Sequence, residues 1–195
     1  MTLGRRYSEL VLASTSPARE ALMRGLGVPF RVVAPEVDEY VSADTPPMHA
    51  VAILAEKKAR AVFARNPTAL VIGADQLVSF NGQAIGKAPD EATARRQLRS
   101  LRGKTHEILT GLCVVGPDFL ATEVDSARLT VLPLSDVEVD AYLATGEWKG
   151  CAGGYRIEGV GQTIFSRIDG DRSSIQGLPM QRVVHSLREA GIRFF

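Results

Sequence analysis

Apolar runs alternate with helical patterns along the first half of this chain. A run of four apolar residues ends in three small hydroxyl residues, and a helical pattern opened by a proline follows it. Glycines and an Asn-Pro pair separate the later segments. The elements predicted in this half are a buried strand at 10–13, a helix at 17–26, a strand at 28–34, a helix at 46–64 and a buried strand at 70–72.

The second half is marked by clear turn and capping signals. Asn81-Gly82 predicts a tight hairpin, whose returning strand ends at residues 85–87. Asp90 is a helix N-cap, and Ser135 with Glu138 forms a capping box. The elements predicted here are a helix at 90–101, strands at 106–115 and 120–132, a helix at 135–145, a strand at 163–168, a polar turn at 169–174 and a helix at 179–190.

Asp75 is predicted to stand at, or just past, the carboxyl end of the buried strand 70–72. Ligands of open α/β sheets bind at that edge. The small residues Gly73 and Ala74 indicate that another group approaches the backbone closely there. A tight hairpin would also bring Lys87 near Asp75. The structural alternative is a buried aspartate held by backbone N–H groups.

The junction at Ser14, Thr15 and Ser16 has the outline of an anion site, because a strand delivers hydroxyls and N–H groups to a helix N-terminus. The alternative is an ordinary serine N-cap followed by Pro17. Arg19 favours the anion site. A cation in the first helical turn is unfavourable unless it meets an anionic partner such as a phosphate.

Two other segments carry candidate polar groups. Glu36, Asp38 and Glu39 form an acidic cluster at a strand end, a pattern more typical of a solvated turn than of a site. A glycine-rich stretch at 146–162 surrounds aromatic and charged residues, among them Glu158, which favours a binding wall over a linker.

Composition limits the alternatives. The 195 residues are 45% hydrophobic and 23% charged, with a formal net charge of +1, so the chain lacks the footprint of a nucleic-acid binder. One domain over residues 1–195 is expected. No apolar run approaches a membrane span, and a cytoplasmic location is the expectation. Cys113 and Cys151 are interpreted as reduced structural residues, and the three histidines show no metal-ligand spacing.

The candidate groups together suit phosphoryl chemistry. Arginine and lysine neutralise phosphate oxygens, while carboxylates hold a divalent metal or orient water. The segment 82–87 (GQAIGK) has the wrong spacing for a P-loop, and no dinucleotide fingerprint is present. Kinase, GTPase and dehydrogenase interpretations are therefore weak. The groups concerned are Ser14, Ser16, Arg19, Lys58 and Lys87 with the acids Glu39 and Asp75.

Several short motifs lie along almost the whole chain. They are STSPxR at 14–19, VDE at 37–39, KKA at 57–59, GADQ at 73–76, GK at 86–87, AGGYRIEG at 152–159 and GLP at 177–179. Their order and spacing together are specific, and they resemble those of one family, the Maf nucleotide pyrophosphatases.

The resemblance implies an α/β fold with an elongated mixed β-sheet, flanking helices and a two-lobed cleft, as in the inosine triphosphate pyrophosphatases. It also implies hydrolysis of a nucleoside triphosphate to the monophosphate and pyrophosphate with a divalent cation (Mg, Mn or Co). By matching position, Asp75 resembles the general base and a metal ligand, and Glu39 a metal or water partner. Arg19, Lys58 and Lys87 resemble a triphosphate clamp. A homodimer is the assembly that the resemblance suggests.

Three positions bear on the base: Ala18, Gln76 and Glu158. The branch that favours dTTP and UTP has arginine, threonine and glutamine there, whereas Gln76 and Glu158 are similar to the branch acting on 7-methyl-GTP. A carboxylate can accept from both guanine donors, N1–H and the 2-amino group. Ala18 departs from both branches, so an aromatic contact is lost or passes to Trp148 or Tyr155.

Three alternatives remain open at this point. The same enzyme could act on dTTP and UTP, or broadly on several triphosphates. A non-catalytic nucleotide-binding regulator of cell division is the second, although a pure binder needs no positioned base. An inosine triphosphate pyrophosphatase is the third, which STSP and GADQ disfavour. Lys57 stands where the family has glutamate, and Ala88 where proline is common.

Overall fold

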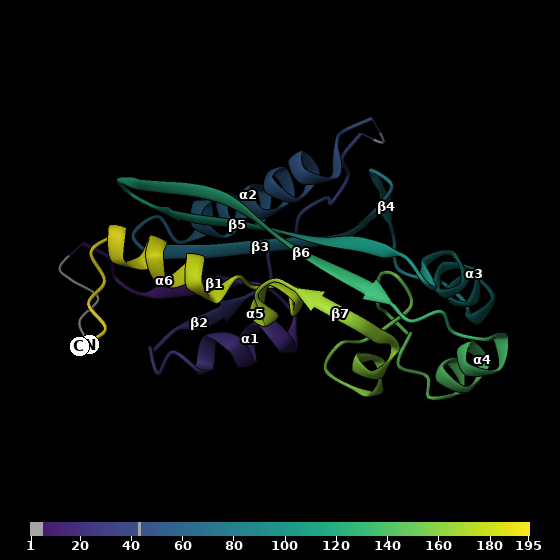
Figure 1. Ribbon diagram of the computed structural model, residues 1–195. Helices are drawn as coiled ribbons and strands as arrows, with labels where there is room; N and C mark the ends of the chain where they lie inside the picture. The colour runs from purple at the N-terminus through teal and green to yellow at the C-terminus, as the bar shows by residue number, and fades with distance from the viewer. Residues whose placement is uncertain (1–5, 43) are drawn as a thin grey trace.

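The computed structural model describes residues 6–42 and 44–195. Strands and helices alternate through the first half, and a long hairpin opens the second (Figure 1). In chain order the elements are β1 (Leu10–Ala13), α1 (Pro17–Arg24), β2 (Arg31–Val33), α2 (Pro47–Arg65), β3 (Leu70–Phe80), β4 (Gln83–Ile85), α3 (Glu91–Leu101), β5 (Thr105–Gly116), β6 (Phe119–Val131), α4 (Asp136–Ala144), η1 (Val160–Ile164), β7 (Phe165–Asp169), α5 (Arg172–Ile175) and α6 (Met180–Glu189).

Within the described residues, seven strands form one mixed sheet in the order β2-β1-β3-β5-β6-β7, with β4 paired to β3. β1 runs parallel to β2 and β3, and the other pairs are antiparallel. Helix α2 covers one face, and α1, α5 and α6 lie on the other (Figure 1). The expected α/β fold with a mixed sheet and flanking helices is confirmed.

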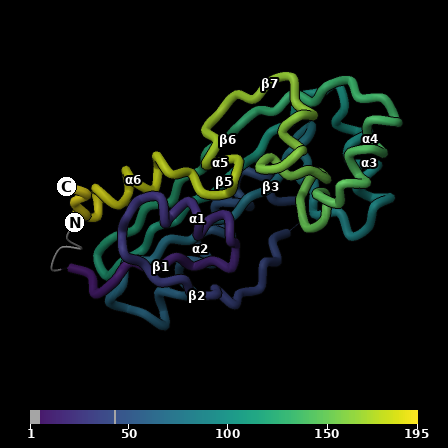
Figure 2. The backbone as a smooth tube through the Cα atoms, turned by 90° about the horizontal axis from the view of Figure 1, so that it is seen from below, coloured from purple at the N-terminus to yellow at the C-terminus, as the bar shows by residue number. Residues whose placement is uncertain are grey.

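Three clusters of buried apolar side chains hold these layers together. One lies around α6, α1 and the start of β3, a second between α2 and the sheet, and a third at the end that carries α3 and α4. Figure 2 shows α3 and α4 together at the end of the molecule farthest from the two termini. Of the helices in residues 6–42 and 44–195, none combines the length and hydropathy that crossing a bilayer requires.

Helix α2 sits against the sheet over two glycines. A Cβ built on Gly73 would lie 2.6 Å from both the Ala55 carbonyl oxygen and the Ala59 nitrogen, and one on Gly111 would meet the Val51 carbonyl. The close approach expected at Gly73 is therefore made by a helix of the chain itself.

The strand predicted to end at residue 72 continues to Phe80, so the expected position of Asp75 at its end is wrong. Pairing with β5 runs from Val71↔Val115 to Ser79↔Glu107, and these ladder hydrogen bonds override the stop that Gly73 suggests. The strand that ends here is β1: its pairing with β3 stops at Ala13↔Gly73. The pairing of β4 with β3 begins only at Val78↔Ile85. Residues 74–77 therefore have no strand partner on that side in the part of the chain that the structure describes.

Local signals gave most of the other bounds correctly. Asn81 and Gly82 have φ angles of 52° and 76°, as a tight hairpin turn requires, and the capping box of Ser135 and Glu138 is present. The strand predicted at 28–34 is shorter, since β2 spans only Arg31–Val33. The short helix α5 lies where a polar turn was predicted, and η1 was not predicted.

Candidate active site

A cavity of about 650 Å³ opens at the gap in the sheet beside residues 74–77. Side chains alternate in direction along a strand, so Asp75 faces α2 while Gln76 faces α5, and both line the cavity. Of the residues expected to form a site, all but one line it; Ala18 is half-buried in α1 and is absent from the lining. The predicted site residues brought together here are Ser14, Ser16, Arg19, Glu39, Lys58, Asp75, Gln76, Lys87 and Glu158.

At the β1–α1 junction the hydroxyls are used to shape the chain. The buried Ser14 accepts a hydrogen bond from the Ser16 backbone nitrogen at 3.0 Å, and Ser16 caps α1 by accepting from the Arg19 nitrogen. The N-cap interpretation is therefore correct. The same residues also line the cavity, so capping and an anion-binding role are compatible at this junction.

Arg19 is aimed into the cavity by the chain that follows α5. Its Nε donates to the Gly177 carbonyl oxygen at 2.8 Å, and Gly177 has a φ of 101°, which favours glycine. Burial lowers the pKa of Arg19, whereas the charges of Asp75 and Glu39 raise it. The GLP motif thus has a structural role in holding this guanidinium.

The shortest charge contacts of the site meet at Lys58. Its Nζ lies 2.5 Å from Asp75 Oδ1 and 2.9 Å from Glu39 Oε1. The side chains of Lys58 and Asp75 are each 8% exposed, whereas that of Glu39 is 60% exposed. The ammonium therefore joins a buried carboxylate to one at the cavity mouth, and it fixes the direction of both.

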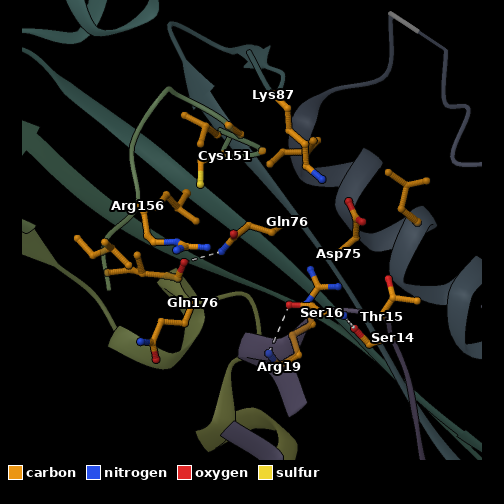
Figure 3. Close-up of a pocket in the computed structure, with 18 of the residues that line it drawn as sticks. Ser14, Thr15, Ser16, Arg19, Asp75, Gln76, Lys87, Cys151, Arg156 and Gln176 are labelled. Atoms are coloured by element: carbon orange, nitrogen blue, oxygen red, sulfur yellow. Dashed lines mark hydrogen bonds between the residues drawn. The ribbon is translucent and has the colours of Figure 1, made fainter. Parts of the chain in front are cut away.

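The charge balance of the cavity suits a polyanion. In the part of the chain that the structure describes, four cationic and three carboxylate side chains line it, a surplus of one positive charge. Figure 3 shows the side chain of Lys87, which follows β4 in the chain, pointing into the cavity from the side opposite Arg19. The main chain at Lys87 forms a β-bridge with Ala152, which fastens the glycine-rich wall to the hairpin.

At the other end of the cavity the Gln76 amide is held by three acceptors. Its Nε2 donates toward the carbonyl oxygens of Ser174 at 2.8 Å and Ile175 at 2.9 Å, and toward Thr110 Oγ1 at 3.2 Å. Because these partners take the N–H groups, the amide oxygen is the group left for a ligand.

Glu147 fastens the loop that carries Glu158. Its carboxylate accepts from the backbone nitrogens of Val160 at 2.9 Å and Gly161 at 3.0 Å, at the start of η1. Two of the N–H groups that a helix start leaves unpaired are satisfied in this way. The exposed Glu158 is thereby carried on an anchored segment beside the cavity.

Only one of the two candidate aromatic residues can serve the cavity. Trp148 is buried away from it and donates from Nε1 to the Leu143 carbonyl at 3.2 Å. Tyr155 lines it, and its hydroxyl lies 2.6 Å from His106 Nε2. Phe165 packs edge-on against the Tyr155 ring, with centroids 4.9 Å apart. Of these two aromatic residues, only Tyr155 lines the cavity.

Comparison with known proteins identifies the family. The family model described as Maf-like protein matches residues 9–190. The chain belongs to the Maf family. A Bacillus cereus relative named dTTP/UTP pyrophosphatase is 38% identical over 189 residues, covering 97% of this chain and 93% of the relative. A Koribacter versatilis relative of the same name is 41% identical over 183 residues, covering 94% of this chain and 95% of the relative.

Membership in the Maf family confirms the family that the motifs resemble and the enzyme class expected, a nucleoside triphosphate pyrophosphatase. The two relatives are named for dTTP and UTP, and their names therefore do not support the expected 7-methyl-GTP branch. Among solved structures, the Staphylococcus aureus Ham1 protein is 16% identical with a TM-score of 0.47, and the match covers 65% of this chain and 73% of that chain.

Arg156 was missed as a site residue of this Maf chain. Figure 3 shows its side chain extending into the cavity toward Gln76. Its backbone nitrogen donates to the Tyr142 hydroxyl at 3.0 Å, which fixes the base of the side chain. Cys151 and Gln176 also line the cavity. The position of Arg156 inside the AGGYRIEG motif was the available signal, but nothing local shows that its side chain points inward.

Glu39 and Asp75 are the carboxylates that could hold a divalent cation. No group of three or more His, Cys, Asp or Glu side chains with metal-site geometry occurs among the described residues. Mg²⁺ and Mn²⁺ need fewer, because they bind through one or two carboxylates together with substrate phosphates and water. A pair of carboxylates on the wall of a cavity for a polyanion fits such a cation.

Acid should weaken the fold through His106. Burial lowers the pKa of His106 from 6.5 to about 4, so the neutral ring is the folded form. The unfolded chain binds the proton more readily, and stability is therefore lost as pH falls from about 6.5 toward 4, by about 2 to 3 kcal/mol. Urea unfolding of wild type and His106→Gln at pH 7 and pH 4.5 measures this. The variant should lose less stability on acidification; an equal loss in both would contradict the assignment to His106.

Proposed function

We propose that this Maf chain hydrolyses a nucleoside triphosphate between its α and β phosphates, releasing the nucleoside monophosphate and pyrophosphate. The observation that carries the proposal is the buried Lys58–Asp75 pair, joined to Glu39 on the wall of a positively charged cavity. A binding module has no need for a desolvated carboxylate positioned in this way. These contacts of Lys58 also support the pyrophosphatase reaction for which the Maf relatives are named.

In the proposed reaction a water oxygen attacks the α-phosphorus, and the bond from that phosphorus to the bridging oxygen breaks. Asp75 accepts the proton of the attacking water. Arg19, Lys58 and Lys87 stabilise the charge that develops on the phosphate oxygens and on the leaving pyrophosphate. A divalent cation such as Mg²⁺, Mn²⁺ or Co²⁺, held by Glu39 and Asp75, would supply further neutralisation of the triphosphate.

For the base, the two acceptors at the far end of the cavity favour guanine, and 7-methylguanine in particular. The Gln76 amide oxygen and the Glu158 carboxylate can accept from the guanine N1–H and 2-amino groups. Methylation at N7 makes the base cationic, and Glu158 then gains a charge interaction. The preferred substrate proposed is therefore 7-methyl-GTP.

A second candidate is dTTP and UTP. It is favoured by the names of relatives that match almost the whole chain, and by Arg156, which can donate to a pyrimidine carbonyl beside Gln76. The two candidates share the reaction and differ only in the base. A homodimer and a cytoplasmic location stay predictions.

The experiment that decides between them measures pyrophosphate release with Mg²⁺ or Mn²⁺ across 7-methyl-GTP, GTP, dTTP, UTP, CTP and ITP. The ranking of kcat/KM values is the readout. If 7-methyl-GTP leads, the proposed base is supported. If dTTP or UTP leads, the second candidate replaces it, and absence of turnover with every nucleotide would contradict the reaction itself.

Replacing Glu158 with glutamine should reduce the preference for 7-methyl-GTP over UTP by about 10-fold to 100-fold, the effect of losing one charged hydrogen-bond partner. Glutamine keeps the length of the side chain but offers only one acceptor and carries no charge. Glu91→Gln is the matched control, because it makes the same change in an exposed pair with Arg95 on α3. An unchanged ratio of kcat/KM between 7-methyl-GTP and UTP in Glu158→Gln would remove Glu158 from base recognition.

A further inference from the structure

The Gln76 amide can take only one orientation. Turning it by 180° would place its oxygen against the carbonyl oxygens of Ser174 and Ile175, where two acceptors would face a third. The residues around Gln76 therefore decide that an acceptor, and no donor, is offered to a base.

Thr110 is the side chain that completes this arrangement. It lies directly opposite Gln76 in the β3–β5 ladder and is fully buried. Its hydroxyl donates to the Ser174 carbonyl at 2.8 Å, so its lone pair is turned toward the Gln76 Nε2 at 3.2 Å. One hydroxyl thus contacts both the glutamine and the carbonyl that the glutamine binds.

A second buried hydroxyl fixes α5 over the sheet. Ser174 is 1% exposed, and its Oγ donates to Asp125 Oδ2 at 2.5 Å. Asp125 is the ladder partner of Thr110 on β6, and its other oxygen accepts from Arg182 Nε on α6 at 3.1 Å. Gln76, Thr110 and Asp125 therefore form a polar row across three strands, with α5 seated on it.

The same short segment also serves the phosphate end of the cavity. The carbonyls of Ser174 and Ile175 orient Gln76, and the carbonyl of Gly177 accepts from Arg19. Three carbonyl oxygens within four residues thus orient one group for the base and one for the triphosphate. A displacement of this segment should change both base selection and triphosphate binding. Loss of the Thr110 hydroxyl should change base selection only.

We infer that Thr110 and Ser174 are positioning residues for base selection: they hold Gln76 with its amide oxygen toward the base. This inference rests on the proposed function, since it needs a nucleotide in the cavity. Neither residue lines the cavity, so their effect is exerted through Gln76.

The test compares wild type, Thr110→Val and Thr110→Ser by kcat/KM over the same six triphosphates. Valine keeps the shape and removes the hydroxyl; serine keeps the hydroxyl. In Thr110→Val, the ratio of kcat/KM between the best and second-best nucleotide should fall about 3-fold to 10-fold, the effect of one neutral hydrogen bond. This loss should appear in KM while kcat is retained, and Thr110→Ser should restore the ratio.

Thr130→Val is the matched control, because its hydroxyl contacts Thr105 on the same sheet, away from the cavity. An unchanged ratio of kcat/KM between the best and second-best nucleotide in Thr110→Val, or an equal fall for every nucleotide, would overturn the inference. Ser174→Ala provides a second measurement if Thr110→Val unfolds, with the same expected fall in the ratio. A wild-type enzyme without turnover would instead contradict the proposed function, so the two failures are distinguishable.

Discussion

Asp75→Asn should lower kcat for the best nucleotide on the order of 10³-fold, within the range that a general base contributes. Asparagine keeps the shape of the side chain, and its amide oxygen can still accept from the Lys58 ammonium, which lies 2.5 Å from Asp75 Oδ1. It cannot accept the proton of the attacking water. Nucleotide binding should therefore persist, and steady-state kinetics with calorimetric titration of the triphosphate measures both quantities.

Asp136→Asn provides the comparison, since the same change is made in an exposed ion pair with Arg99 and Arg102 far from the cavity. Its kcat should equal that of wild type. If Asp75→Asn kept more than about a tenth of the wild-type kcat, a loss too small for general-base catalysis, Asp75 would not be the base. If Asp75→Asn lost both nucleotide binding and turnover, Asp75 would be assigned to binding the substrate.

The parts of the fold predicted well are those set by local chemistry. The turn at Asn81-Gly82 needs two residues with positive φ, and the Ser135–Glu138 box satisfies N–H groups within one turn. Helix bounds followed from caps and apolar spacing in the same way. Short-range hydrogen bonds decide these features, so the sequence window around each of them contains the necessary information.

Nearly all the residues expected to form a site line one cavity, but their arrangement in it was not predicted. Asp75 lies in the middle of β3 because pairing with β5 continues past it, and no local signal reveals that partner. Lys58 lines the cavity as expected, but no local signal reveals that its ammonium also joins Asp75 to Glu39. Arg156 extends into the cavity from the glycine-rich segment, toward Gln76 on β3 (Figure 3). Each of these facts depends on contacts between segments distant in sequence.

Lys57 departs from the family pattern without changing the contacts of Lys58 with Asp75 and Glu39. It stands where the family has glutamate, and its Nζ donates to the Tyr40 carbonyl at 2.9 Å. Two successive lysines of α2 therefore hold two successive residues, since Lys58 contacts the Glu39 carboxylate. The change places a cation outside the cavity and tethers the acidic segment, while the groups assigned to the chemistry stay in contact.

The position of all these groups depends on how closely α2 approaches the sheet, and Gly73→Ala should disturb it. The added methyl would lie 2.6 Å from the Ala55 carbonyl oxygen and the Ala59 nitrogen, both backbone atoms that cannot rotate away. Overpacking of this kind costs about 3 kcal/mol. The variant should unfold at lower urea concentration, and kcat/KM should fall because a displaced α2 draws Lys58 from Asp75.

Gly86→Ala is the matched control for stability, because a Cβ at Gly86 meets nothing within 4 Å. Its unfolding midpoint should match that of wild type. If Gly73→Ala were as stable as wild type, α2 would not rest on Gly73. If it were less stable but fully active at a temperature where it is folded, then the Lys58–Asp75 contact would not depend on this approach, and α2 could move without changing the chemistry. We expect both quantities to fall, because Lys58 is carried by the turn of α2 that meets Gly73.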